Sequence, residues 1–421
     1  MMEPILLRRT GLERSDSIDV YLGNGGYQAL ETALHEMAPA DLIDTIKRSK
    51  LRGRGGAGFP AGLKWDFMPK EDVTKYLCVN TDEGEPGTFK DRLLIERDPH
   101  QVIEGAIIAA YAVGACHVYV YIRGEFFQGV KSWIKAIADA YQYGYLGQDI
   151  LGSGFSLDMT IHRGAGAYIC GEETAMIESL EGRRGSPRLK PPYPSQRGYL
   201  QQPTLVHNVE TLANVPHIVQ NGAEWYAAIG TEKSTGPKLF CISGHVNRPG
   251  VYELPLGTPL RRLIEDCAGG VSGGRRLKAV VPGGASTAVL TAEQVDVPMD
   301  FESLVEAGSS LGTGAVIVMA EGTCMVDVAR RTAHFFAHES CGHCTPCRVG
   351  SQRILQILER VEAGRAPIDD IDRLYSLCEG IAGNTFCPMG DAQVLPLRSL
   401  LDRFGDEFRA HIELGRCPVA A

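Results

Sequence analysis

Residues 339–347 read ESCGHCTPC, and a further cysteine, Cys387, stands directly before a proline. The first three cysteines, Cys341, Cys344 and Cys347, recur every three residues, so one tight loop can present three thiolates. A fourth, distant cysteine followed by proline completes the ligand set of a [4Fe–4S] cluster. The spacing therefore predicts that these four cysteines hold such a cluster in a chain that transfers electrons.

The spacing alone leaves two alternatives to this ligand set. A zinc site is one, although zinc ribbons usually pair one CxxC with a second CxxC. Cys378 is the other, as a candidate for the fourth ligand in place of Cys387. The remaining cysteines have no motif spacing, and we expect them to be buried or inert thiols: Cys78, Cys116, Cys170, Cys241, Cys267, Cys324 and Cys417.

The composition is that of a globular protein. The chain has 421 residues, of which 44% are hydrophobic, and a formal net charge of -9; this length suggests about three domains. The acidic balance, without a dense stripe of Lys and Arg, argues against nucleic-acid binding. The N-terminus lacks the apolar core of a signal peptide, and twelve cysteines without an export signal fit a reducing cytoplasm.

One apolar segment, residues 102–122, is nearly long enough to span a bilayer. Glu104 and His117 interrupt it, and its second half is rich in β-branched and aromatic residues. We therefore expect a buried helix that leads into a buried parallel strand, and no membrane span.

The pattern along the chain predicts three domains. Alternating strands and helices in residues 1–236 indicate an α/β layer with a largely parallel sheet. Residues 237–323 have a β-β-α-β pattern, which is typical of a small α+β domain of the β-grasp (ubiquitin-like) type. Residues 324–421 are helical. Their first helix has apolar residues on one face, which we expect to be core: Met325, Val328, Ala329, Thr332 and Phe336.

A glycine-rich stretch, residues 53–62, is the first candidate ligand site. Glycines let a backbone approach a phosphate or a planar ring closely, and a following helix offers free N–H groups. Lys64 adds positive charge, and Phe59 and Phe67 could stack against a flat ligand. The pattern G-x-G-x-x-G is weak by itself, because a helix rather than a strand precedes it here. A flexible loop with ordinary core aromatics is the alternative.

An acidic loop follows the strand expected at residues 76–80 and contains Asn80, Asp82 and Glu85. Ligands of open α/β sheets bind beyond the carboxyl ends of the strands, where such carboxylates can accept hydrogen bonds from ribose or ribityl hydroxyls. A solvated acidic turn is the alternative. A second glycine turn, residues 163–173, ends in Glu172 and Glu173, which could simply favour a helix dipole.

The long loop at residues 183–203 is rich in Pro, Arg and Gly, and its length predicts a functional role. Its Lys190 and Tyr193 could bind an adenine by charge and stacking, or only cover the loop.

Seven motifs occur in one order that resembles a known family. They are GRGGAGFPAGLKW (53–65), NTDEGEPG (80–87), GAGAYICGEET (164–174), LKPP (189–192), NVET (208–211), ESCGHCTPCR (339–348) and FCP (386–388). Together they resemble the NADH-oxidising flavoprotein subunit (the 51-kDa or F subunit) of bacterial respiratory complex I, over nearly the whole chain. The resemblance implies a Rossmann-like domain for FMN and NADH, then a β-grasp domain and a helical bundle with the cluster.

The resemblance also implies roles for individual residues. The FMN contacts would be Gly53, Gly55, Lys64, Asn80, Asp82, Gly171, Glu172, Asn208 and Thr211. The NADH site would be lined by Phe59, Phe67, Glu85, Glu173, Lys190 and Tyr193, with Tyr168 and Glu85 near the nicotinamide. Cys341, Cys344, Cys347 and Cys387 would hold the [4Fe–4S] cluster beside the flavin. No side chain would act as acid or base, because the cofactor carries the redox chemistry.

The implied partners are a [2Fe–2S] thioredoxin-like subunit and a large subunit with several iron–sulfur clusters. Through them the chain would sit on the cytoplasmic face of the inner membrane without a span of its own. His207 and His343 depart from the family pattern, where Asn and Lys are usual. The rival within the same chemistry is the flavin subunit of a soluble NAD-reducing hydrogenase or NAD-dependent formate dehydrogenase. A non-enzymatic electron relay and a zinc-stabilised interaction protein are further alternatives.

Overall fold

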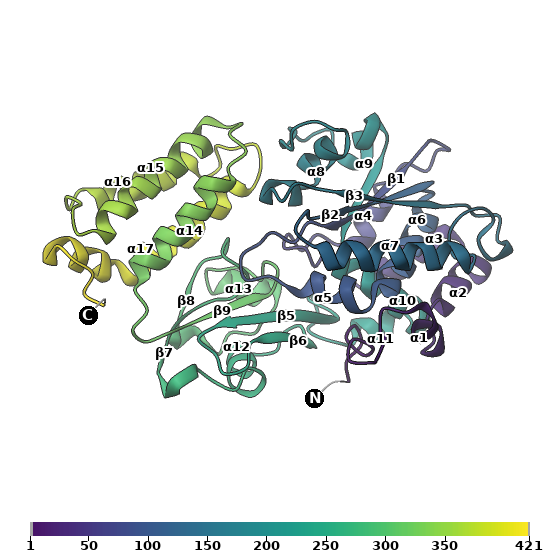
Figure 1. The fold of residues 1–421 in the computed structure, drawn as a ribbon, viewed down its shortest axis with the longest axis horizontal. Coiled ribbons are helices and arrows are strands. Elements are labelled where there is room, and N and C mark those ends of the chain that lie inside the picture. Colours follow the sequence, from purple (N-terminus) through teal and green to yellow (C-terminus); the bar gives the residue numbers. More distant parts are fainter. Residues whose placement is uncertain (1–2, 420–421) are drawn as a thin grey trace.

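A four-stranded parallel sheet organises the first half of the chain (Figure 1). The computed structural model describes residues 3–419. The strand order is β3-β2-β1-β4, with β1 Tyr76–Thr81, β2 His117–Ile122, β3 Asp158–Arg163 and β4 Thr204–Asn208. Asn80 of β1 lies opposite Asn208 of β4 in this register. The carboxyl ends of the two strands therefore meet at one edge of the sheet.

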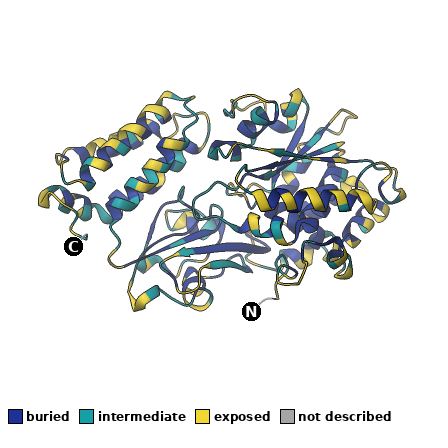
Figure 2. Ribbon diagram, in the orientation of Figure 1, coloured by how far each residue is buried: buried dark blue, intermediate teal, exposed yellow. Residues whose placement is uncertain are grey.

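Helices pack around this sheet. The bounds are α1 Ile18–Gly23, α2 Gln28–Glu36, α3 Pro39–Arg48, α4 Ala61–Asp66, α5 Lys90–Arg97, α6 Pro99–Val113, α7 Phe127–Gln142, α8 Glu173–Leu180, α9 Pro194–Arg197, α10 Val209–Asn221 and α11 Ala223–Ala227. Helix α7 turns a polar face outward, as the exposed residues along it show in Figure 2, and buries the opposite face. These elements confirm the predicted α/β layer.

Helix α6 and strand β2 account for the long apolar segment. Pro99 begins the helix and Gly114 ends it in a left-handed conformation, with φ of 73°. Glu104 is buried inside α6, where it accepts hydrogen bonds from the backbone N–H groups of Tyr27 and Leu30 at 3.0 Å each. Among the described residues no helix is both long and apolar enough to cross a membrane.

A second, mixed sheet of five strands follows in the order β6-β5-β9-β7-β8. Its strands are β5 Pro237–Gly244, β6 Gly250–Pro255, β7 Leu277–Val281, β8 Leu290–Thr291 and β9 Ala315–Ala320. Its helices are α12 Leu260–Arg262, which continues into a π-helical turn at Leu263–Cys267, and α13 Phe301–Glu306. An antiparallel hairpin, a helix and a third strand thus appear in the predicted order, with β9 inserted parallel to β5.

Four helices make up the C-terminal part: α14 Met325–Glu339, α15 Thr345–Glu362, α16 Asp370–Ile381 and α17 Met389–Leu414. They form the bundle on the left of Figure 1. Met325, Ala329 and Phe336 of α14 are buried, and Val328 packs against the bundle core, as their helical spacing predicts. The loop between α14 and α15 contains the first three motif cysteines.

Buried polar contacts join the second sheet to the N-terminal segment and to α10. Glu253 of β6 accepts the backbone N–H groups of Ile5, Leu6 and Leu7 at 2.9 Å each. Lys238 of β5 is buried and lies 2.7 Å from the carboxylate of Glu210 at the start of α10. These contacts hold the second sheet beside the carboxyl edge of the first.

Candidate functional site

A cavity of about 1080 Å³ opens at the carboxyl edge of β1 and β4. All three parts of the chain contribute to its wall. The structure brings together around it every residue that the sequence assigned to FMN or NADH: Gly53, Gly55, Phe59, Lys64, Phe67, Asn80, Asp82, Glu85, Tyr168, Gly171, Glu172, Glu173, Lys190, Tyr193, Asn208 and Thr211.

The first glycine stretch forms one side of this cavity. The loop closes on itself where the Gly53 N–H donates to the Phe59 carbonyl at 2.8 Å. At Gly55 an added Cβ would lie 3.1 Å from the Asn208 side chain, so the loop runs tightly along the end of β4. Gly58 has φ of 66° and its added Cβ would lie 2.3 Å from Phe301. The loop is therefore a fixed wall rather than a flexible connector.

The acidic loop after β1 forms the floor. The Asn80 amide donates to the Gly171 carbonyl at 2.9 Å, which joins the acidic loop to the second glycine turn. The same side chain accepts the Asp82 N–H at 3.0 Å. Asp82 is buried, and its Oδ2 atom has no hydrogen-bond partner. Burial raises the pKa of Asp82 to about 7. The unsatisfied carboxylate oxygen is suited to accept a hydrogen bond from a ligand in this cavity.

Glu83, in the same loop, has a structural role. Its carboxylate accepts the backbone N–H groups of Asp91 and Arg92 at 2.8 and 3.0 Å, near the start of α5. This capping satisfies free donors at the helix start.

Glu85 and Tyr168 form a hydrogen-bonded pair in the cavity wall. The Tyr168 hydroxyl donates to Glu85 Oε2 at 2.7 Å, and the Ser286 N–H donates to Oε1 at 2.7 Å. Burial raises the pKa of Glu85, although these two donors oppose the effect. Ser286 belongs to the loop between β7 and β8, so the second sheet holds this carboxylate in place.

A charged cluster of two lysines and two glutamates borders the cavity. Lys64 lies 2.8 Å from one oxygen of Glu173, and Lys190 lies 2.9 Å from the other. Lys190 also lies 2.9 Å from Glu172, which caps α8 by accepting the N–H groups of Thr174 and Ala175. Burial alone would raise the pKa of Glu173, but the two lysines lower it to about 2. Glu173 is thus a fixed negative charge.

Three aromatic side chains remain open to solvent at the mouth of the cavity. Phe59, Phe67 and Tyr193 are 46%, 59% and 53% exposed. The rings of Phe59 and Phe67 lie 6.1 Å apart, centroid to centroid, in a tilted arrangement. Exposed aromatic faces beside a cavity are suited to stack against a planar ligand, and their exposure does not fit the alternative that they are core.

The four motif cysteines meet between α14, α15 and the start of α17. Burial, and to a smaller extent the neighbouring Cys341 and Cys344, raise the pKa of Cys347. Burial, with Cys341 and Cys347 among the smaller causes, raises the pKa of Cys387 to about 12. Backbone and side-chain groups surround the sulfurs: the Phe386 N–H points to Cys344 Sγ at 3.3 Å, and the Gln393 amide to Cys347 Sγ at 3.4 Å. Such N–H···S contacts are typical around iron–sulfur clusters.

Cys387 itself lines the cavity, together with Pro388, Met389 and Ala392. The other candidate for fourth ligand, Cys378, is buried in the apolar core of the bundle on α16. The structure therefore joins the cysteine set and the ligand cavity through Cys387.

Other wall residues have no motif that could have revealed them. Thr313 comes from the turn before β9, and its hydroxyl bonds that of Thr88 at 2.7 Å. Lys90 and Asp91 also line the cavity: Asp91 accepts the amide N–H of the predicted residue Asn208 at 2.6 Å and pairs with Lys90 at 2.8 Å. His207 accepts the Trp65 indole N–H at 2.7 Å, so its Nε2 is occupied inside the protein.

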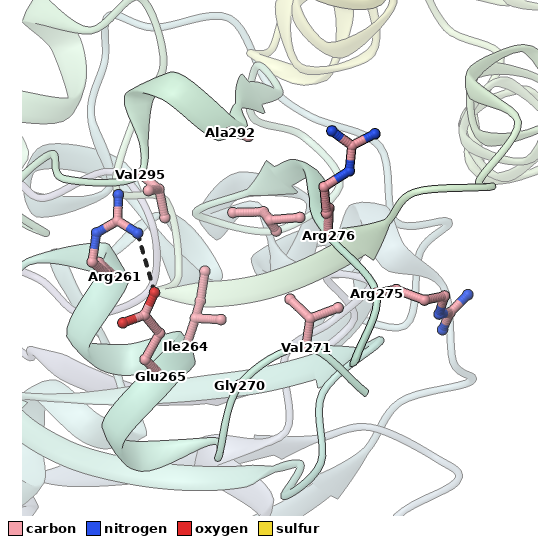
Figure 3. Close-up of a pocket in the computed structure, with 10 residues that line it drawn as sticks. Arg261, Ile264, Glu265, Gly270, Val271, Arg275, Arg276, Ala292 and Val295 are labelled. Atoms are coloured by element: carbon pink, nitrogen blue, oxygen red, sulfur yellow. Dashed lines mark hydrogen bonds and ion pairs between the residues drawn. The ribbon is translucent and has the colours of Figure 1, made fainter. Parts of the chain in front are cut away.

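A second cavity, of about 450 Å³, lies in the second sheet's region (Figure 3). None of the residues predicted for ligand binding lines it. Two of its three arginines already pair with carboxylates: Arg261 with Glu265 at 3.1 Å and with Asp296 at 2.6 Å, and Arg276 with Glu321 at 2.9 Å. The third, Arg275, bonds to Ser272. The larger cavity is therefore the candidate site.

Comparison with known families gives three matches along the chain. Residues 46–217 match the Nuo51 FMN-binding domain, residues 238–318 the SLBB domain, and residues 327–411 the NADH-ubiquinone oxidoreductase-F iron-sulfur binding region. The last match contains all four motif cysteines.

Individual proteins match over the full length. The chain is 54% identical over 419 residues to the F-2 subunit of NADH-quinone oxidoreductase of Rhizobium meliloti, covering 99% of this chain and 100% of that one. It is 52% identical over 398 residues to the corresponding F subunit of Mycobacterium bovis, covering 93% and 89%. A crystal structure of an NAD+-reducing [NiFe]-hydrogenase is similar at a TM-score of 0.85 with 38% identity, covering 99% of this chain and 67% of that one.

Proposed function

The chain belongs to the F-subunit family of NADH-quinone oxidoreductases, and from that premise we propose how its own residues bind FMN, NADH and the cluster. It is an FMN-dependent NADH dehydrogenase subunit: electrons leave NADH, pass through FMN and reach a [4Fe–4S] cluster. The fold is the expected one, with an α/β part, an SLBB (β-grasp) part and a helical iron–sulfur part.

The cavity residues fit FMN. The unpartnered Oδ2 of buried Asp82 offers an acceptor for a ribityl hydroxyl, and Lys64 offers positive charge. Close packing leaves no room for a larger residue at Gly58 and little room at Gly55. We therefore assign FMN binding to Gly53, Gly55, Lys64, Asn80, Asp82, Gly171, Glu172, Asn208 and Thr211.

The outer part of the cavity fits NADH. Exposed aromatic rings at the mouth suit stacking of the adenine and of the nicotinamide. Phe59, Phe67, Glu85, Glu173, Lys190 and Tyr193 would line this part, with Tyr168 beside Glu85 near the nicotinamide. The fixed negative charge of Glu173 would hydrogen-bond ribose hydroxyls and repel the extra phosphate of NADPH.

The observation that best supports electron transfer is the position of Cys387, which lines the nucleotide cavity and lies among the other motif cysteines. FMN held in this cavity would supply the conversion between the two-electron chemistry of NADH and the one-electron chemistry of an iron–sulfur cluster. The protein's own residues bind and orient the two nucleotides and exclude water. Cys341, Cys344, Cys347 and Cys387 would hold the cluster at the cavity wall.

The subunit acts within an oxidoreductase complex with iron–sulfur partners. We propose that these are a [2Fe–2S] thioredoxin-like subunit and a large subunit with several clusters, and that they hold the chain at the cytoplasmic face of the inner membrane. The domain limits 1–236, 237–323 and 324–421 are part of the same proposal.

A soluble NAD-reducing hydrogenase is the second candidate for the assembly, because the similar solved structure has that activity. The F-subunit relatives match at higher identity and over nearly their own full length, which favours the complex I assembly. Copurification from the whole-cell extract, membrane and soluble fractions alike, decides between them: quinone-reducing partners support the first assembly and hydrogenase subunits the second.

The residue assignment is tested with the variant Cys387→Ser and the matched control Cys378→Ser. We expect Cys387→Ser to lose most of its iron and keep FMN, because only the cluster depends on this thiolate. Acid release of flavin and iron analysis measure both. Full iron in Cys387→Ser, or iron loss only in Cys378→Ser, would contradict the assignment.

A further inference from the structure

Four potential metal ligands meet at the end of the helical bundle where the chain ends. They are Cys324, Glu362, His411 and Cys417, which we call the C-terminal ligand cluster. One ligand atom from each lies within 4.8 Å of all the others. No local spacing groups these residues, and the sequence predicts the two cysteines to be inert thiols. Their side chains nevertheless converge.

The three distances among Cys324, Glu362 and His411 match a tetrahedral zinc ion, and Cys417 Sγ lies within 4.8 Å of each of them. With Zn–S bonds of about 2.3 Å and Zn–N and Zn–O bonds of about 2.0–2.2 Å, tetrahedral geometry separates S from N by roughly 3.5 Å, S from O by roughly 3.6 Å and N from O by roughly 3.4 Å. Cys324 Sγ lies 3.4 Å from His411 Nε2 and 3.7 Å from Glu362 Oε2. His411 Nε2 lies 3.6 Å from Glu362 Oε2.

Hydrogen bonds orient the ligands from outside, as they do around metal sites. His411 is fully buried, and its Nδ1 lies 2.7 Å from the Glu407 carbonyl. A carbonyl can only accept, so Nδ1 carries the proton and the Nε2 lone pair points to the other three ligands. Cys324 Sγ accepts the Asp327 N–H at 3.3 Å at the start of α14, which fixes the direction of this side chain.

The backbone brings these four residues together from separate elements. Cys324 precedes α14, Glu362 ends α15, His411 is on the last turns of α17, and Cys417 follows that helix. The turns after α15 and α17 touch: an added Cβ at Gly364 would lie 2.0 Å from the Gly415 backbone. The close approach requires glycine at position 364, and both glycines have positive φ, 63° and 65°.

The cluster is separate from the iron–sulfur ligands. Helix α14 has 15 residues and lies between Cys324 and the loop that contains Cys341. At 1.5 Å per residue its length is about 22 Å. In Figure 1 the C-terminal part of α17 lies at the end of the bundle away from α8. A metal here could not take part in the path from NADH to the [4Fe–4S] cluster.

We propose that Cys324, Glu362, His411 and Cys417 bind one zinc ion. Two sulfurs, one imidazole and one carboxylate in tetrahedral array suit zinc better than harder divalent cations, which prefer oxygen ligands. With four protein ligands the site has no open position, so its role is structural. It fastens the last residues of the chain to the starts and ends of three bundle helices.

Metal analysis and zinc K-edge X-ray absorption of the intact, iron-loaded protein test this proposal. We expect about one zinc beside about four iron atoms per chain, with two sulfur ligands at about 2.3 Å and two lighter ligands at about 2.0–2.2 Å. Cys417→Ser is expected to lose the zinc and keep the iron. Cys267→Ser, which changes a partly exposed cysteine of the second sheet's region, serves as the matched control and should keep both metals.

Three results would overturn the proposal. Iron-loaded protein from zinc-replete cells could contain no zinc. The absorption spectrum could show four sulfur ligands, which would mean that zinc had replaced iron at the motif cysteines. Mass spectrometry of alkylated protein could reveal a disulfide between Cys324 and Cys417. The wild-type measurements decide the question even if a variant fails to fold.

Discussion

Asp82 is the cavity residue whose buried carboxylate has an oxygen without a hydrogen-bond partner. Its Oδ2 is buried without a hydrogen bond, and burial raises its pKa to about 7. A hydroxyl of FMN donated to this carboxylate would favour its charged form. Below about pH 7 the carboxyl of the ligand-free protein is protonated, so FMN binding must release that proton. FMN affinity should therefore rise as the pH increases through about 7.

Asp82→Asn is expected to remove this part of the pH dependence and to weaken FMN binding by roughly 10-fold or more, the scale of one hydrogen bond to a charged group. Titrations of flavin fluorescence with the apoprotein, below and above about pH 7, measure it. The phosphate of FMN titrates equally with both proteins, so the difference isolates Asp82. Parallel pH profiles for the two proteins would disprove this role.

Glu173 governs the choice between NADH and NADPH in our assignment. Lys64 and Lys190 keep it charged, with a pKa of about 2. Glu173→Gln removes the repulsion and leaves both lysines available to a phosphate. We expect kcat/KM for NADPH to rise roughly 10-fold, about 1.4 kcal/mol, which one charge near a surface can supply. Steady-state kinetics with NADH and with NADPH measure this change. An unchanged ratio of the two kcat/KM values would refute the assignment.

At the residue scale the motifs predicted the cavity well, because each one places glycines and charged residues at the end of a strand or the start of a helix. Ser286 and Thr313 could not be predicted, since they reach the cavity only through packing of the second sheet. The C-terminal ligand cluster could not be predicted from the sequence for a similar reason, because residues 324, 362, 411 and 417 share no local spacing. Their proximity depends on how three helices pack.

At the element scale, β5 and α10 are joined by a buried ion pair. Lys238 and Glu210 lie 2.7 Å apart, and Lys90 also contacts Glu210 at 2.8 Å. Lys238→Met leaves this buried cluster with one positive charge fewer. Removing one partner of a buried pair typically destabilises a protein by about 3–5 kcal/mol.

We therefore expect Lys238→Met to lower the midpoint of thermal unfolding, measured by circular dichroism on apoprotein. Arg276→Met is the matched control, because its pair with Glu321 is exposed and should leave the midpoint unchanged. Equal midpoints for Lys238→Met and wild type would mean that this pair does not hold β5 to α10.

At this scale the apolar segment at residues 102–122 was predictable as a buried helix followed by a buried strand. These elements are α6 and β2, and the helix begins at Pro99 and ends before Gly114 because proline and glycine act locally. The insertion of β9 parallel to β5 was not predictable, since strand order depends on contacts distant in sequence. The sequence pattern nevertheless identified the α/β, β-grasp and helical parts of the chain.

At the scale of the whole molecule, the central feature is a single cavity built from all three parts of the chain. The α/β part supplies the nucleotide-binding residues, the second sheet holds Glu85 through Ser286, and the helical part supplies Cys387. This arrangement puts a cluster ligand in the wall of the nucleotide cavity. Electrons from NADH should therefore reach the iron within this one chain.

An anaerobic NADH titration of the cluster-reconstituted protein, followed by visible absorbance and low-temperature EPR, tests this electron path most directly. We predict that NADH bleaches the flavin absorbance, that NADPH does so much less, and that the EPR signal of a reduced [4Fe–4S] cluster appears. Cys387→Ser should retain flavin bleaching without that signal. A cluster signal from chemical reductant in a protein that binds no flavin and does not respond to NADH would contradict the proposed path.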